Sequence, residues 1–504
     1  MKKSFLYKIN TIALAACISF SSISCDELIE INPETAIDAS TALTTRENVE
    51  AAIIGVYVPL KGLTEYGNRL VTLPEALADN GMATGKSGRL VNEAANIRGA
   101  ANHFTHWTTS YNAIARINYI LDAIPTLQGA TVTEDLKNSY IAELKFLRAL
   151  YHFDLVRAYA YIPGAVVDAK NRGGVPVVTT AFKTPAAALE FKPSRPAIED
   201  VYTAIYADLD DAIAKYGTGG AFSTPGRASK VAVQALYSRV ALYRKDYPKV
   251  IEMSTAAIDT RGASLTNAGN YVAAWGGAVH PESIFEIQFS AQAESNGVNE
   301  SLQTAFTTLV QRGNRNQTGG FGDLVPTPSL LSALGITVTG NGTANAAITA
   351  RSSDVRNLLF ELGTAGRGAP YVETTKFLGK SGFINVDNIP VIRIAEMYLN
   401  RAEAYANTAG GDVNALLDVN RIRTNRGLEP SLALGQDLKN EILLQRRLEF
   451  AFEGHRFFDL KRLGLDILKP ATGATVAFTE DVILPAVPQA DVDGNPNLKQ
   501  NSGY

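Results

Sequence analysis

The 504-residue sequence is poor in the residues that most often bind metals or form disulfide bonds. It has five histidines and two cysteines, Cys17 and Cys25, both within the first 25 residues. The rest of the chain therefore has no material for a disulfide framework or a cysteine nucleophile. It also lacks the Gly-x-Ser-x-Gly motif of serine hydrolases. These absences argue against a zinc protein and against the common forms of nucleophilic catalysis.

An excess of charge of one sign is also missing. The 47 basic and 50 acidic residues nearly balance, so the chain lacks the basic surplus that nucleic-acid binding needs. With 46% hydrophobic and 19% charged residues, the composition is that of a folded protein, not of a disordered or polytopic membrane protein. At about 100–200 residues per domain, the length allows about two to four domains or one large helical array.

The N-terminus has the pattern of a bacterial export signal. A lysine-containing start precedes an apolar run that is too short to span a membrane, as in secretory signal peptides. The segment 22–25, Ser-Ile-Ser-Cys, resembles a lipoprotein processing site, at which the cysteine is acylated. We predict a signal peptide over 1–24 and lipidation of Cys25, with Cys17 as the alternative. Acidic residues follow directly, as in the export signal of surface lipoproteins, and predict a tether over 25–33.

Helical periodicity dominates the rest of the chain. Apolar residues recur at three- and four-residue steps over 48–60, 107–124, 136–159, 198–213, 229–243, 249–259, 392–407, 413–426 and 437–463. Two helix pairs, 229–259 and 392–426, resemble each other, with small residues at similar steps before each turn. Such pairs are typical of tetratricopeptide units, which stack to share a core. We therefore predict a mostly α fold with a divergent, tetratricopeptide-like repeat scaffold.

Two regions interrupt this pattern. Gly, Asn, Thr and Ser become frequent over 62–106 and 262–390, and alternating runs such as 283–289 predict short strands. Long loop-rich insertions in a compact protein usually serve a function. We predict an N-terminal helical region over 34–261, a loop-rich ligand-binding region over 262–390, and a C-terminal helical region over 391–504.

Two short motifs in the first loop-rich region invite a chemical interpretation. The segment 80–87 approaches a phosphate-binding loop, but Asn80 stands where that motif needs glycine. His103 and His106 have a spacing that metal ligands use, yet no carboxylate motif accompanies them. Their aromatic neighbours Phe104 and Trp107 favour packing or ligand stacking instead. We predict no metal and no cofactor.

The C-terminal third carries a dense pattern of arginine, glutamate and aromatic residues. Its longest stretch reads Arg-Leu-Glu-Phe-Ala-Phe-Glu-Gly-His-Arg-Phe-Phe-Asp-Leu-Lys-Arg. Matching stretches occur in order at 146–149, 174–176, 226–230, 393–404, 420–423, 447–462 and 495–504. Together they resemble the SusD/RagB family. Gln445, where a glutamate is common, and the segment 489–491 are small departures from the family pattern.

The charged residues of these stretches lie among large apolar residues, where charges persist only when paired. We expect an Arg–carboxylate network that clamps the last helices together, because arginine can bind a carboxylate with two parallel hydrogen bonds. Its expected members are Arg393, Glu396, Arg401, Glu403, Arg447, Glu449, Glu453, Arg456, Asp459 and Arg462. The residues that carry the resemblance are thus interpreted as structural.

The resemblance implies a lipid-anchored outer-membrane protein that captures oligosaccharides, or in some members peptides, for a SusC-like TonB-dependent transporter. Capture needs aromatic faces and hydrogen-bond donors but no reactive group. Our candidate ligand-binding residues are Asn80, Arg89, His103, Phe104, Asn314, Arg315, Asn316 and Phe321. Further candidates in the same regions are Tyr66, Asn96, Arg98, Asn296 and Arg312. A peptide-binding lipoprotein, a structural assembly protein and a surface glycosidase remain as alternatives.

Overall fold

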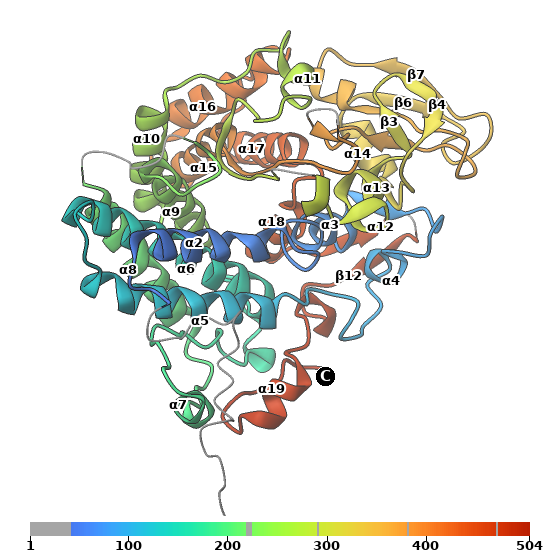
Figure 1. Ribbon diagram of the computed structural model, residues 1–504. Coiled ribbons are helices and arrows are strands. Elements are labelled where there is room, and N and C mark those ends of the chain that lie inside the picture. Colours follow the sequence, from blue (N-terminus) through green and yellow to red (C-terminus); the bar gives the residue numbers. More distant parts are fainter. Residues whose placement is uncertain (1–41, 218–223, 290–291, 381–382, 470–471) are drawn as a thin grey trace, which may run out of the picture.

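Paired helices make up most of the chain (Figure 1). The computed structural model describes residues 42–504 except 218–223, 290–291, 381–382 and 470–471. The predicted signal peptide, Cys25 and the tether lie outside the described residues. The main helices are α2 (Arg46–Tyr57), α5 (Trp107–Ala123), α6 (Glu134–Tyr159), α8 (Ile198–Tyr216), α9 (Lys230–Arg244), α10 (Tyr247–Arg261), α15 (Ile394–Ala406), α16 (Asp412–Asn425), α17 (Gly435–Glu449) and α18 (Arg456–Leu463).

These helices stack in sequence, which confirms the predicted mostly α, tetratricopeptide-like scaffold. α5 packs on α6, α6 on α8, α8 on α9 and α9 on α10. The stack then passes to the C-terminal region, because α10 also packs on α15, which contacts α16 and α17. The two predicted helical regions therefore share one continuous packing arrangement, although the loop-rich region separates them in sequence.

Local sequence explains where the helices begin and turn. At the start of α6, the Thr133 side chain accepts a hydrogen bond from the Leu136 amide, and two acidic residues follow in the first turn. α9 begins after Ser229 and α10 after Asp246, each capped in the same way. Lys245 between them has φ +62°, and this left-handed residue ends α9 so that α10 folds back beside it.

The prediction of one helix over 437–463 was wrong, because the chain breaks between α17 and α18. Phe452 and Gly454 have φ values of +63° and +84°, which no continuous α-helix accommodates. The break lets the Gly454 amide donate a hydrogen bond to Glu75 Oε1. A Cβ atom at position 454 would lie 2.4 Å from the Leu70 carbonyl oxygen. Periodicity could not reveal this break, since it depends on a segment almost 400 residues away in the sequence.

The loop-rich regions contain short helices and two-stranded antiparallel sheets. The strands are β1 (Gly81–Ala83), β2 (Ser283–Ile287), β3 (Leu309–Gln311), β4 (Asn314–Thr318), β5 (Leu324–Pro326), β6 (Ile336–Thr339), β7 (Ala347–Arg351), β8 (Phe360–Leu362), β9 (Val372–Thr374), β10 (Ile389–Arg393), β11 (Ile467–Lys469) and β12 (Ala474–Val476). The short helices are α3 (Arg69–Ala76), α4 (Val91–Ala94), α7 (Pro185–Glu190), α11 (Tyr271–Ala274), α12 (Gly297–Glu300), α13 (Leu302–Phe306), α14 (Pro328–Ala333) and α19 (Gln489–Gly494).

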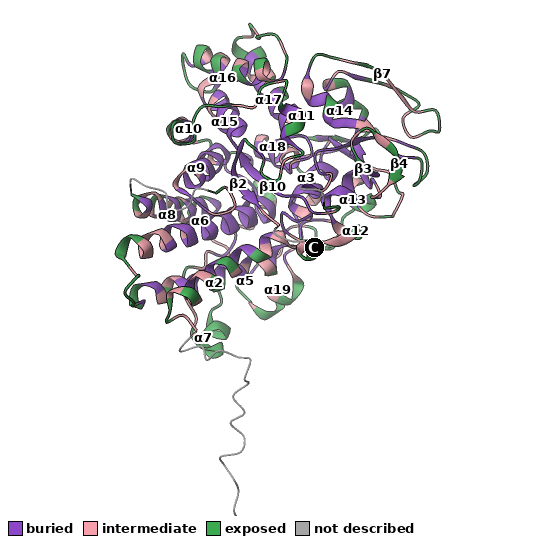
Figure 2. Cartoon of the chain, turned by 45° about the horizontal axis from the view of Figure 1, so that its top comes forward, coloured by how far each residue is buried: buried purple, intermediate pink, exposed green. Residues whose placement is uncertain are grey.

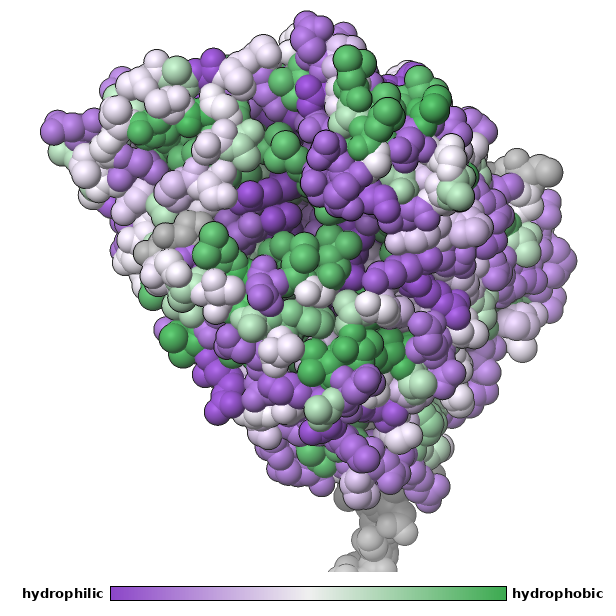
Figure 3. All heavy atoms as spheres, turned by 180° about the vertical axis from the view of Figure 1, so that it is seen from behind, coloured by the Kyte–Doolittle hydropathy of each residue, from purple (hydrophilic) through white to green (hydrophobic). Residues whose placement is uncertain are grey.

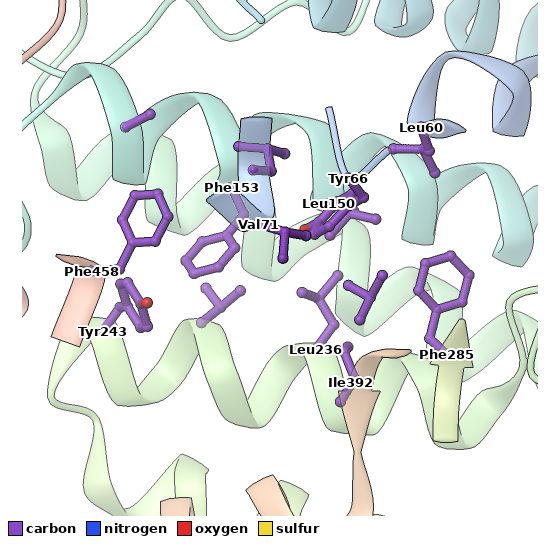
Figure 4. Packing of buried hydrophobic residues seen from close by; sticks show 14 of the residues in the cluster. Leu60, Tyr66, Val71, Leu150, Phe153, Leu236, Tyr243, Phe285, Ile392 and Phe458 are labelled. Atoms are coloured by element: carbon purple, nitrogen blue, oxygen red, sulfur yellow. The ribbon is translucent and has the colours of Figure 1, made fainter. Parts of the chain in front are cut away.

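Two of the sheets join segments that are distant in sequence. β1 pairs with β5, and β2 pairs with β10, whereas β3–β4, β6–β7, β8–β9 and β11–β12 are local pairs. The expected strand at 283–289 is confirmed as β2. Buried residues fill the space between the helices and these sheets (Figure 2). Phe153 on α6, Leu236 on α9 and Phe285 on β2 are part of one core layer between α6 and α9 (Figure 4).

The expected Arg–carboxylate network is present and extends further than predicted. Arg393 bridges three carboxylates, at 2.8 Å from Glu282 Oε2, 3.0 Å from Glu449 Oε1 and 2.8 Å from Glu453 Oε2. Arg456 reaches out of the C-terminal region to Asp79, with N–O distances of 2.6 and 2.8 Å. The family-type residues therefore clamp the first loop-rich region as well as the last helices.

Candidate functional site

The pairing of β1 with β5 brings the two loop-rich regions together at one place. Met82 lies opposite Val325 in the register, and beyond the strand the Thr84 amide donates to the Asp323 carbonyl at 2.9 Å. The Thr84 hydroxyl donates to the Gly322 carbonyl at 2.8 Å. The loop that leads to α4 is thereby fixed against the segment that precedes β5. Side chains from residues 86–89 and 321–323 can meet only because of this pairing.

A half-buried aromatic ring, Phe321, lies at the centre of this junction. The Arg89 guanidinium carbon is 5.3 Å from the ring centroid, and that of Arg367, from the loop between β8 and β9, is 4.2 Å away. Arg367 is exposed and makes no hydrogen bond or ion pair with residues that the structure describes. We call this place the Phe321 site, and its members are Lys86, Arg89, Phe321, Asp323, Arg367, Tyr371 and Glu373.

Acidic groups hold Arg89 beside the ring. Its Nε lies 3.4 Å from Glu300 Oε1, and its Nη1 lies 3.9 Å from Asp323 Oδ2. Ser87 donates to the other oxygen of Asp323 at 2.5 Å. Burial raises the pKa of Asp323, while the hydrogen bond from Ser87 and the charge of Arg89 offset part of that rise. The guanidinium group is therefore oriented before any ligand arrives.

The inner wall of the site is polar and incompletely satisfied. Lys86 Nζ lies 3.6 Å from Glu373 Oε1 and 5.5 Å from the centroid of the Tyr371 ring. The second Glu373 oxygen accepts hydrogen bonds from the Thr308 amide, the Thr308 hydroxyl and the Thr307 hydroxyl. Burial raises the pKa of Glu373, and the bonds from Thr308 oppose this rise.

Three buried polar atoms of this wall make no hydrogen bond: Lys86 Nζ, Asp323 Oδ2 and Glu373 Oε1. Buried polar atoms almost always have a hydrogen-bond partner, so such a cluster calls for an explanation. The three atoms come from the first loop-rich region, the segment before β5, and β9. Each of them instead lies within ion-pair distance of an opposite charge: Lys86 Nζ and Glu373 Oε1 are 3.6 Å apart, and Asp323 Oδ2 is 3.9 Å from Arg89 Nη1.

The β3–β4 hairpin borders the same site. Arg315 is exposed on β4 and donates from Nε to the Gly363 carbonyl at 3.0 Å, which joins the hairpin to the loop that carries Arg367. Asn316 is exposed beside it, and Asn314 is half-buried in the turn. The structure therefore brings Arg89, Arg315 and Phe321 into one neighbourhood, although the first of them is more than 200 residues from the others.

Three of the candidate residues are buried in the protein interior, away from solvent. The Asn80 amide donates to Glu75 Oε2 and its oxygen accepts from Arg447 Nε at 2.8 Å. His103 Nε2 lies 3.1 Å from the Val482 carbonyl oxygen. The Phe104 ring stacks on Phe458 with centroids 5.2 Å apart. Only 1–4% of each of these three residues is exposed, so they offer no surface to a ligand and leave our candidate set.

The additional candidates are likewise engaged in structural contacts. Tyr66 donates to the buried Asp154, and Asn296 donates to the carbonyls of Lys61 and Gly67. Other bonds join Asn96 to the Leu77 carbonyl, Arg98 to Asp481, and Arg312 to Thr375.

Sequence reasoning did not select Lys86, Asp323, Arg367, Tyr371 or Glu373. Residue type alone gave no signal for them, because lysines and acids of this kind occur in many loops. The run Gly-Arg-Gly at 366–368 was a usable clue, since glycines on both sides leave an arginine free to reach a ligand. The reverse face of the molecule carries several apolar patches among hydrophilic residues, so an exposed apolar side chain does not by itself mark a site (Figure 3).

The described residues contain no group of three or more His, Cys, Asp and Glu side chains arranged to hold a metal ion. Within the same part of the chain, every helix is too short or too polar to cross a membrane.

Comparison with known protein families assigns the chain. A family described as "SusD family" matches residues 371–504, and one described as "Starch-binding associating with outer membrane" matches residues 32–242. The chain belongs to the SusD family. The two matching segments leave residues 243–370 between them, and Phe321, Asp323 and Arg367 of the Phe321 site lie in this interval.

Individual relatives, aligned over the whole chain or over part of it, agree with this assignment. The SusD-like protein P2 of Formosa agariphila is 27% identical to this SusD-family chain, over 100% of both chains. The starch-binding protein SusD of Bacteroides thetaiotaomicron is 34% identical over 129 residues, which are 23% of this chain and 22% of that protein.

Solved structures share the fold. A SusD superfamily protein from Bacteroides thetaiotaomicron has a TM-score of 0.74 at 24% identity, covering 90% of this chain and 99% of that one. A laminarin binding SusD-like protein has a TM-score of 0.68 at 21% identity, covering 92% of this chain and 100% of that one.

Proposed function

We propose that this protein is a cell-surface lipoprotein that captures oligosaccharides at the Phe321 site and delivers them to a TonB-dependent transporter, without chemical conversion. The proposal rests chiefly on one observation: a half-buried aromatic ring, Phe321, lies beside the guanidinium groups of Arg89 and Arg367. An aromatic face suits the apolar face of a sugar ring, and guanidinium donors suit its hydroxyl groups.

The charge arrangement disfavours a basic peptide. The carboxylates of the site are each within ion-pair distance of Lys86 or Arg89, so a cationic ligand meets no unopposed negative charge. A ligand can also displace Arg367 from the ring of Phe321 easily, because Arg367 forms no ion pair with the described residues. A sugar ring can replace this guanidinium group at little cost.

Two observations support the membrane attachment that we propose. One matching family is described by its association with the outer membrane, and the sequence around Cys25 has the form of a lipidation site. In our proposal, the acyl chains on Cys25 hold the protein at the surface, and the acidic tether separates its folded part from the membrane.

Glycan binding tests the proposal directly. The chain from Asp26 onward is titrated calorimetrically with laminarin, starch, other polysaccharides and peptides, and released sugar is measured in parallel. We expect saturable binding of one glycan class without product release. Phe321→Ala and Arg89→Ala should each weaken that binding by about tenfold or more, which corresponds to about 1.4 kcal/mol.

A matched pair on the helical scaffold provides the control. Arg244 lies 4.8 Å from the Tyr206 ring and pairs with Glu199 at 2.9 Å, and its side chain is as exposed as that of Arg89. Arg244→Ala and Tyr206→Ala should therefore leave glycan affinity unchanged. Equal losses in both pairs would show that the effect is general, and peptide binding or sugar release would refute the proposed function.

A further inference from the structure

A cavity of about 330 Å³ lies at the end of the molecule opposite to β4. It is bounded by the start of α5, by residues 176–178 and 191–193, and by α19 with the segment after it. Figure 1 shows α7 and α19 together at this end. The volume falls in the range of small-ligand sites, about 300–1,000 Å³. We call it the Trp107 pocket, and the residues that define it here are Trp107, Tyr111, Asn112, Phe191, Lys192 and Asp491.

The apolar wall of the Trp107 pocket is formed before any ligand binds. Tyr111 packs on Trp107 with ring centroids 5.0 Å apart, and its hydroxyl donates to the Pro176 carbonyl at 2.8 Å. Phe191 stands at the rim with 38% of its surface exposed, and it leans on Phe182 at 4.8 Å. Three aromatic rings, two from α5 and one from the segment after α7, thus line one concave surface.

Polar groups of both signs face this wall. The carboxylate of Asp491 accepts a hydrogen bond from the Trp107 side chain, and burial raises its pKa while that bond opposes the rise. Lys192 Nζ donates to the Gly494 carbonyl at 2.6 Å, which leaves two of its protons available. Asn112 is exposed, and its side chain makes no hydrogen bond with residues that the structure describes.

Charge balance restricts the ligand class. A cationic ligand would meet Lys192, and an anionic ligand would meet Asp491, so neither is favoured by the pocket as a whole. A neutral polyhydroxylated ring fits both groups, because each hydroxyl can donate to Asp491 or accept from Lys192 and Asn112. Its apolar face can lie on Phe191 or Tyr111.

We propose that the Trp107 pocket is a second saccharide-binding site, which takes one neutral sugar unit and makes glycan binding by this protein bivalent. The inference deepens the proposed function, because it rests on glycan capture at the Phe321 site. Two weak sites on one chain raise the affinity for a long polymer without strengthening either site, since binding at the second becomes intramolecular.

Only one of the protein's two tryptophans, Trp107, lies in this pocket, so its emission can be followed by itself. Trp275→Phe leaves Trp107 as the sole tryptophan, and its emission reports directly on this pocket. The probes are D-glucose, D-galactose, D-mannose, D-xylose and N-acetyl-D-glucosamine, each too small to span both sites. Saturation-transfer NMR on the otherwise unaltered protein repeats the titration, so that the result does not depend on how well the Trp275→Phe variant folds.

We expect at least one sugar to change Trp107 emission saturably. Asp491→Asn and Phe191→Ala should weaken that response by about tenfold, given the strength of a hydrogen bond to a charged group. Phe321→Ala should leave it unchanged but weaken polysaccharide binding. If no sugar alters the emission or the NMR signal, or if Asp491→Asn and Phe191→Ala bind like the unaltered protein, the second site is refuted while glycan capture at Phe321 stands. If sugars change Trp107 emission but Phe321→Ala binds polysaccharide as tightly as the unaltered protein does, the Phe321 site is refuted instead.

Discussion

Replacement of Glu449 by glutamine tests how the buried charge network stabilises the fold. Within the described part of the chain, ion pairs connect four basic and four acidic residues around it: Arg356, Lys376, Arg393, Arg426, Glu282, Asp354, Glu449 and Glu453. Glu449 is fully buried and accepts hydrogen bonds from Arg426 at 2.8 Å and from Arg393 at 3.0 Å, and it lies 3.5 Å from Arg356 Nη1. Glutamine keeps the shape but removes the negative charge.

The expected loss of stability is large. Burial alone would raise the pKa of Glu449, but the charges of Arg426 and Arg393 hold that pKa well below its ordinary value. The carboxylate is therefore ionised in the folded protein, and removing its charge leaves one positive charge uncompensated in the interior. Breaking a buried ion pair in this way costs about 3–5 kcal/mol. With an unfolding entropy of about 2.1 cal/mol/K per residue, a chain of 504 residues should lose about 3–5 °C in melting temperature.

Circular dichroism during heating measures this change. Glu199→Gln is the control, because Glu199 forms an ion pair with Arg244 while 55% of its side chain is exposed, and exposed pairs contribute about 0–1 kcal/mol. A melting temperature for Glu449→Gln that equals that of Glu199→Gln would refute the claim that the network stabilises the fold through its charges.

Three further predictions concern other contacts. Burial lowers the pKa of His152 to about 4, below its value of about 6.5 in the unfolded chain. The unfolded state therefore binds more protons between these values, and stability falls as the pH drops from 6.5 toward 4. In His152→Gln the free energy of unfolding should therefore change less steeply with pH in this range, by about 1.4 kcal/mol per pH unit. Melting temperatures recorded across the range follow this change, and an unchanged pH dependence would contradict the lowered pKa of His152. Gly454→Ala should destabilise the fold by more than Gly410→Ala, because both residues have positive φ but only position 454 has a neighbour within 4 Å of an added Cβ; urea unfolding compares them, and equal midpoints would exclude the clash. Tyr66→Phe should cost about 1–3 kcal/mol by leaving Asp154 without its hydrogen bond, with glycan affinity unchanged in calorimetry; a loss of affinity would return Tyr66 to the binding site.

The sequence by itself determined the helical scaffold and the family. Apolar residues at helical spacing are a local property, so the long helices begin and end within a few residues of their predicted bounds: α2, α5, α6, α8, α9, α10, α15 and α16. The charged residues of the C-terminal stretches were correctly expected to pair, because a buried charge without a partner is too costly to persist. The break between α17 and α18 escaped prediction, since the hydrogen bond from Gly454 to Glu75 involves a distant segment.

Only the tertiary structure decided which loop residues form the Phe321 site. Asn80, His103 and Phe104 have the same residue types as ligand-contacting side chains, and nothing in their sequence neighbourhood shows that Arg447 and Phe458 cover them. Arg89 and Phe321 meet because β1 pairs with β5. Strands of three residues carry almost no sequence signal, and their pairing depends on how the rest of the protein brings them together. Local sequence patterns therefore predict the helical scaffold, whereas the Phe321 site depends on contacts between segments far apart in the chain.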